Sequence, residues 1–77
     1  MKLSQVKLNE KVVVQKLNLK ADVKNRLISL GVCENKEIIV EKTSFLGGTL
    51  LVKVGDIRII MQKSIAERII TTGGEND

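Results

Sequence analysis

The chain has 77 residues, a formal net charge of +4 and a pI of about 9.5, and its one aromatic residue is Phe45. It has no proline and no histidine, and its single cysteine, Cys33, cannot form an intramolecular disulfide, which excludes a disulfide-stapled secreted domain. Without histidine, the common zinc and haem ligand sets are excluded as well. No signal-peptide core and no membrane-length apolar run is present, so we expect one small, soluble, cytoplasmic domain.

The composition favours β-structure. Nine Val, nine Ile and four Thr make 22 of the 77 residues β-branched. The first ten residues read as an irregular segment, and the first strand is predicted over 12–17, where three valines begin an apolar run.

A short helix is predicted after this strand. Asp22 is a candidate N-cap, and Val23, Leu27 and Leu30 follow at a spacing that places them on one helix face. Gly31 ends the helix, because glycine tolerates the left-handed conformation that often follows the last turn.

The rest of the chain is predicted to be mostly strand. Gly55-Asp56 separates two apolar runs and indicates a tight hairpin turn. Ser64 and Glu67 have the spacing of a capping box, which predicts a helical turn with Ile65 facing inward. Four further strands are expected, at 37–43, 49–54, 57–61 and 69–71. We therefore predict a mainly β, partly open five-stranded barrel over 1–72 and a disordered tail over 73–77.

The positive charge is concentrated in the first half of the chain. Residues 1–36 hold eight Lys or Arg and three acidic residues, whereas residues 37–77 hold five Lys or Arg and six acidic residues. A basic half is compatible with a solvated surface, nucleic acid, anionic lipid or an acidic protein. Ten of the thirteen basic residues are lysine and one residue is aromatic, which argues against base readout or base stacking.

The titratable residues do not form a catalytic pattern. Nucleophile–histidine pairs are impossible, so we expect no enzymatic activity and no cofactor. Glu34, Glu37 and Glu41 are close in sequence, but Glu37 and Glu41 lie roughly 13 Å apart along a strand, too far for one cation, and solvated edge charges are favoured. Cys33 is expected to be a small buried hydrophobe rather than a reactive thiol.

The loop between the second and third predicted strands carries Phe45 and Leu46 before two glycines. Two large apolar side chains on such a loop form either a plug of the core or an exposed contact for a partner. The sequence leaves both interpretations open.

Four sequence motifs follow one another in an informative order. Residues 26–32 have the pattern R-L-x-x-L-G-Φ, and 3–6 is similar to an L-S-x-L opening. Residues 47–59 resemble an apolar G-x-P-L-x-V-x-V-x-G-x-x-I-x-L stretch, with a shifted spacing and without its proline, and 64–69 resembles an x-x-A-x-x-I ending. Together these motifs resemble the FeoA family of ferrous iron transport proteins. Two Pro-Gly turns of the family are replaced by Leu8-Asn9 and Glu34-Asn35, and asparagine tolerates the left-handed conformation that such turns need.

The resemblance implies an SH3-like barrel, a module also found at the C-terminus of DtxR-type repressors. It also implies a cytosolic accessory protein that contacts the GTP-binding region of the ferrous iron transporter FeoB and modulates Fe²⁺ uptake, reaching the membrane only through that transporter.

Within this hypothesis, we assign a structural role in the fold, and no partner contact, to Leu27, Leu30, Gly31, Gly55 and Ala66. Partner contact is assigned to Lys24 and Arg26 on the helix and to Phe45 and Leu46 on the loop. No metal ligand is assigned. The alternatives are an SH3-like nucleic-acid-binding module that uses the basic half and a metal-sensing module.

Overall fold

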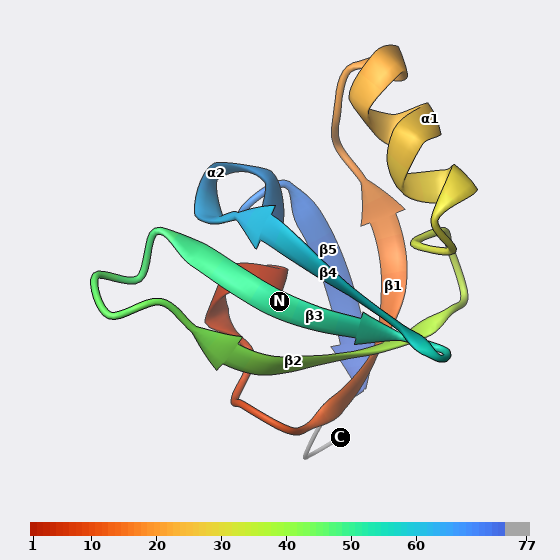
Figure 1. Cartoon of the computed structure of the whole chain (residues 1–77). Coiled ribbons are helices and arrows are strands. Elements are labelled where there is room, and N and C mark those ends of the chain that lie inside the picture. The colour runs from red at the N-terminus through yellow and green to blue at the C-terminus, as the bar shows by residue number, and fades with distance from the viewer. Residues whose placement is uncertain (74–77) are drawn as a thin grey trace.

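The computed structural model describes residues 1–73 and consists of one curled sheet with a helix beside it (Figure 1). The two α-helices are α1 (Ala21–Ser29) and the single turn α2 (Lys63–Ala66), and a 3-10 helix spans Leu3–Gln5. The five strands are β1 (Lys11–Leu17), β2 (Glu37–Thr43), β3 (Thr49–Val54), β4 (Ile57–Gln62) and β5 (Ile69–Gly73).

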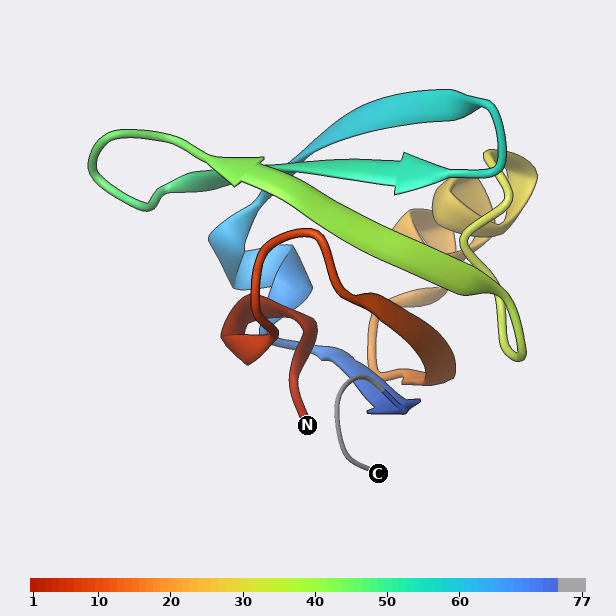
Figure 2. The same ribbon diagram turned by 90° about the horizontal axis from the view of Figure 1, so that it is seen from below.

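All neighbouring strands are antiparallel, in the order β4-β3-β2-β1-β5. β4 and β5 are therefore the edge strands. The register shifts in β1 between Val14 and Lys16 and in β2 between Val40 and Lys42, and such bulges increase the local bend of a strand. The sheet curls around its core, as the view from below shows (Figure 2).

The core lies inside this curl. β2 and β3 alternate between buried and less buried positions, as strands with one core face do. The fully buried side chains come from every strand except β4, from the N-terminal 3-10 helix, and from the β1–β2 and β4–β5 connections: Leu3, Val14, Val32, Ile38, Val40, Val52, Ala66, Ile69 and Thr71. Apolar burial of this kind is the main force that holds the sheet closed.

The helix in the first connection begins earlier than predicted. Lys20 is the N-cap residue and has no capping side chain, so the prediction of Asp22 as N-cap is wrong. Asp22 is the second helical residue, and its carboxylate accepts a hydrogen bond from the Val23 amide at 2.8 Å. An acid in the first turn still favours the helix, because it lies near the positive end of the helix dipole.

The prediction of a capping box formed by Ser64 and Glu67 is also wrong. Gln62 is the N-cap residue of α2, Ser64 is already helical, and Glu67 is the C-cap residue, so the pair cannot cap reciprocally. α2 starts directly where β4 ends, and this direct transition leaves no room for Ser64 before the helix. Ile65 packs against the core as predicted.

The strand predictions agree with the structure for β2 and β3, whereas β1 and β4 each have one more residue than predicted. β5 extends to Gly73, which pairs with Val12, so Gly73 is not part of a tail. The rest of the predicted disordered tail, 74–77, lies outside the described residues.

Two asparagines adopt the left-handed conformation that replaces a glycine. Asn9 has φ 67° and Asn35 has φ 73°, which confirms the prediction for both turns. Each turn is tied to the sheet, because the Asn9 amide donates to the Val40 carbonyl at 2.7 Å and the Asn35 amide donates to the Val14 carbonyl at 2.8 Å. Gly55, in the predicted hairpin turn, has φ 58°.

The N-terminal segment is more ordered than predicted, because it forms the 3-10 helix and is attached to β5. The Met1 ammonium donates to the Thr71 carbonyl at 2.9 Å, and the Thr71 amide and hydroxyl donate to the Met1 carbonyl at 2.7 and 2.9 Å. Within residues 1–73, neither α-helix has the length and hydropathy that a membrane span requires.

Candidate functional site

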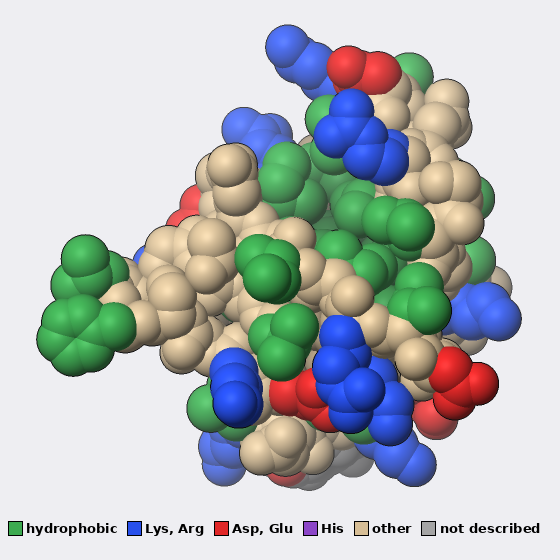
Figure 3. All heavy atoms as spheres, viewed as in Figure 1, with side chains coloured by type: hydrophobic (Ala, Val, Ile, Leu, Met, Phe, Trp, Pro, Cys, Tyr) green, Lys and Arg blue, Asp and Glu red, His purple; other side chains and the backbone are tan. Residues whose placement is uncertain are grey.

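An apolar groove lies between α1 and the edge strand β4. Its cavity is about 450 Å³, and Figure 3 shows green side chains gathered around this hollow. The helix and its C-cap residue form one wall, with Val23, Arg26, Leu27 and Leu30. The opposite wall consists of Ile59, Ile60, Met61, Gln62 and Ile65. We call this feature the α1–β4 groove.

The groove exists because β4 pairs on one side only. β3 covers one edge of β4, and in the described residues no strand covers the other. Ile60 remains 74% exposed there, although isoleucine is usually buried. An apolar edge strand is a ready surface for association, because its side chains and unpaired backbone groups face solvent.

The two leucines of the helix wall differ in exposure. Leu27 is buried, at 7% exposure, and Leu30 is 38% exposed and lines the groove. Leu30 was assigned to the fold, but α1 ends at Ser29, and Leu30 leaves the helix as its C-cap residue. Leu30 is therefore available to a partner.

A second hollow of about 310 Å³ continues the groove toward the start of α1, and the two share Val23 and Ile65. Its other lining residues include Lys20 and Arg68. Segments 20–26 and 63–68 together carry five basic residues, Lys20, Lys24, Arg26, Lys63 and Arg68, and two acidic residues, Asp22 and Glu67. The α1–β4 groove and the hollow that continues it are thus bordered by net positive charge.

The four predicted contact residues occupy two separate surfaces. Lys24 is half-buried and Arg26 is exposed, both on α1, and Arg26 lines the α1–β4 groove. Phe45 and Leu46 lie on the β2–β3 loop, which projects from the opposite side of the molecule from α1 (Figures 1 and 2). The structure therefore does not bring the two pairs together.

The β2–β3 loop is exposed and does not plug the core, which rules out one of the two interpretations that the sequence leaves open. Phe45 is 100% exposed and Leu46 is 88% exposed. The base of the loop is closed by hydrogen bonds from the Ser44 amide to the Thr49 carbonyl at 2.9 Å and from the Gly47 amide to the Ser44 carbonyl at 2.8 Å.

Of the two acidic residues on β2, Glu37 is exposed as a solvated charge is, whereas Glu41 differs from the prediction of solvated edge charges. β2 is an interior strand, and Glu41 accepts a hydrogen bond from the Arg58 guanidinium at 2.7 Å. This hydrogen bond holds the pKa of the Glu41 carboxyl below its ordinary value and raises the pKa of Arg58. Across residues 1–73, His, Cys, Asp and Glu form no group of three that could hold a metal ion, and Cys33 is only half-buried.

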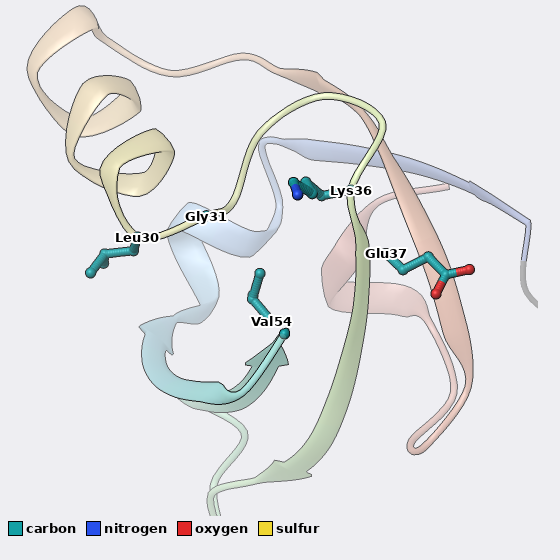
Figure 4. Close-up of a pocket in the computed structure, with 6 residues that line it drawn as sticks. Leu30, Gly31, Lys36, Glu37 and Val54 are labelled. Atoms are coloured by element: carbon teal, nitrogen blue, oxygen red, sulfur yellow. The ribbon is translucent and has the colours of Figure 1, made fainter.

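Another pocket, of about 420 Å³, lies at the end of α1, where Leu30 and Gly31 face Val54 and the start of β2 (Figure 4). Gly31 has φ 100°, and a Cβ added there would lie 3.3 Å from Val54 Cγ1. Both facts assign Gly31 to the fold, as predicted. Glu37, the first residue of β2, and Lys36 before it line the same pocket.

Residues 1–72 match the model of the FeoA domain family. The chain belongs to the FeoA domain family. A Campylobacter jejuni protein that is named as an Fe(2+) transport protein A is 29% identical to this chain over 69 residues. The match covers 90% of this chain and 93% of that protein.

Solved FeoA structures have the same fold. The solution structure of FeoA from Chlorobium tepidum has a TM-score of 0.88 at 27% identity and covers 92% of this chain and 68% of that chain. The crystal structure of Stenotrophomonas maltophilia FeoA with zinc has a TM-score of 0.75 at 32% identity, and the match covers 94% of this chain and 89% of that chain. That protein is described as an SH3 domain protein and a candidate ferrous iron transport activating factor, so the predicted SH3-like fold is confirmed.

Sequence reasoning missed most of the α1–β4 groove. It assigned no contact role to Ile59, Ile60 or Leu30. The available signal was the run from Ile57 to Met61, in which the three isoleucines, 57, 59 and 60, occupy both strand faces. A strand that is apolar on both faces has either a covering element or an exposed apolar side.

Proposed function

We propose that this FeoA-family protein is a cytoplasmic, non-enzymatic binding module that modulates Fe²⁺ uptake by docking on the cytosolic GTP-binding region of a FeoB-type transporter. Family membership supports the link to ferrous iron transport, because relatives carry names of Fe(2+) transport and of transport activation. The α1–β4 groove is the surface that we assign to this contact.

The exposed apolar edge of the groove is the observation that carries the proposal. Ile60 at 74% exposure, beside Leu30 and Ile59, offers an apolar anchor site on an edge strand. Large exposed apolar patches on small soluble domains commonly mark interaction sites, and apolar anchors supply most of the binding energy of an interface.

The border of the groove supports an acidic partner segment. Lys24 and Arg26 on α1 and Arg68 beyond α2 contribute to its positive charge. Such charges accelerate association with an acidic surface and suppress association with a basic one. We therefore expect an apolar segment with flanking Asp or Glu residues to occupy the groove.

The test is a titration of the purified cytosolic region of the transporter by calorimetry. Because Ile60 is largely exposed, Ile60→Glu should leave the fold intact and weaken binding about tenfold or more. Lys24→Glu/Arg26→Glu should slow association and reduce its dependence on salt. Leu8→Glu, at an exposed apolar residue outside the groove, is the matched control and should bind like wild type.

Wild-type affinity in Ile60→Glu would overturn the assignment of the groove. Phe45→Ala/Leu46→Ala tests the other predicted contact pair, and equal binding by this variant and wild type would remove the β2–β3 loop from the transporter interface.

A further inference from the structure

The tip of the β2–β3 loop presents an apolar pair to solvent that the α1–β4 groove does not use. Phe45, the one aromatic residue of the chain, has no part of its side chain covered, and Leu46 beside it is nearly as exposed. In Figure 3, green side chains project beyond the body of the molecule at the position of the β2–β3 loop in Figure 1. Exposing such side chains to water is unfavourable unless another surface covers them.

The loop holds this pair in a defined turn. Ser44 supports the base of the turn twice, because its hydroxyl accepts from the Thr49 amide at 3.1 Å and its carbonyl accepts from the Gly47 amide at 2.8 Å. A tip whose backbone groups are partly satisfied internally enters an apolar medium at a lower cost than an open loop.

Two lysines lie at the base of the loop, one on each side. Lys42 lies near the end of β2, where it pairs with Leu51, and Lys63 lies next to the other side of the loop, because its amide donates to the Gly48 carbonyl at 2.9 Å. Both residues are exposed. Apolar side chains bordered by lysines are complementary to an anionic bilayer surface, which offers acyl chains beneath negative headgroups.

The size of the tip favours a lipid surface over a protein surface. Two side chains bury at most about 400 Å², whereas a stable protein interface buries about 800 Å² on each partner. A projecting knob contacts a flat protein surface poorly, but a bilayer deforms around it. We propose that the Phe45–Leu46 tip inserts into the headgroup region of an anionic membrane, with Lys42 and Lys63 at the lipid phosphates.

This proposal goes beyond the indirect membrane association that the family resemblance implies, and it does not depend on the partner of the α1–β4 groove. The loop and α1 lie on opposite sides of the molecule, so both surfaces are available at once (Figure 2). Two weak contacts held together reinforce each other, because the second becomes intramolecular once the first has formed.

The test uses the full chain and Phe45→Trp, which introduces the sole tryptophan. With vesicles of phosphatidylcholine containing about one third phosphatidylglycerol, its emission should shift to shorter wavelength and be quenched by lipids brominated on their acyl chains. Ile60→Trp, in the α1–β4 groove, should show no shift. Salt should weaken the response, since the lysine contribution is screened.

A charge series completes the test. Lys42→Glu/Lys63→Glu, in the Phe45→Trp background, should lower vesicle partitioning about tenfold or more. Lys20→Glu/Lys24→Glu changes the net charge equally, away from the tip, and should lower it much less. No shift of Phe45→Trp with anionic vesicles, an equal shift of Ile60→Trp, or a shift with lipid-free transporter alone would each overturn the proposal. A failure here leaves the calorimetric test of the groove unaffected.

Discussion

At the scale of single residues, positive φ angles explain why particular residue types occur at particular turns. Asn9 and Asn35 adopt the left-handed conformation at two turns, and asparagine is the non-glycine residue that does so at least cost. Gly31 carries two constraints at once, a φ of 100° and close packing on Val54. Its position in the R-L-x-x-L-G-Φ motif therefore has a physical reason.

We expect Gly31→Ala to lower the free energy of unfolding by about 1–2 kcal/mol, because alanine is strained at this φ and its Cβ would press on Val54. Urea denaturation measures the change. Gly48→Ala is the matched control, since a Cβ at Gly48 meets nothing within 4 Å, and it should change stability by less than about 0.5 kcal/mol. Equal losses in both variants would contradict this explanation.

At the scale of elements, α1 has nine residues, which is too short for an independent helix. Packing against the sheet must hold it in place, and Leu27 is its one buried side chain. Leu30, one turn further along, contributes to the groove instead. The same predicted apolar stripe thus divides into one residue for stability and one for contact.

This division predicts effects of different size and kind for two similar substitutions. Leu27→Ala should lower the free energy of unfolding by about 2–4 kcal/mol, because it leaves a cavity beneath the helix. Leu30→Ala should lower it by less than about 1 kcal/mol and should weaken binding to the transporter region. Thermal denaturation and calorimetry separate the two effects, and a large stability loss in Leu30→Ala would show that Leu30 belongs to the core.

At the scale of the whole molecule, the positive charge is spread over several surfaces. Lys11, Lys53 and Arg58 lie in one cross-strand row with Ile39, and residues in such a row share a sheet face. Glu41 pairs with Arg58 and interrupts the positive row, and Phe45 lies at the loop tip. This arrangement is a poor platform for nucleic acid, which needs continuous positive charge or stacking residues.

We therefore expect no binding to labelled single-stranded or duplex DNA or RNA at physiological salt, measured by fluorescence anisotropy. Any binding at low salt should be weak and should disappear as salt is raised, because a few lysine–phosphate contacts release few counterions. Micromolar affinity that persists at physiological salt would favour the nucleic-acid-binding alternative over transporter docking.

The structure confirms those sequence predictions that depend on local rules. Apolar runs rich in β-branched residues place the strands within about one or two residues at each end, and Gly31, Asn35 and Gly55 mark turns that need positive φ. The cap predictions at Asp22 and Ser64 were wrong because the preceding chain decides where each helix starts: α2 begins directly where β4 ends.

Only the tertiary structure decided what is exposed. The order β4-β3-β2-β1-β5 leaves β4 at an edge, and this position exposes Ile60. The topology also places α1 and the β2–β3 loop on opposite sides, which separates Lys24 and Arg26 from Phe45 and Leu46. The sequence by itself determined a short chain with little aromatic or metal-binding chemistry. Whether an apolar residue is core or contact depends on long-range strand pairing, which local patterns do not encode.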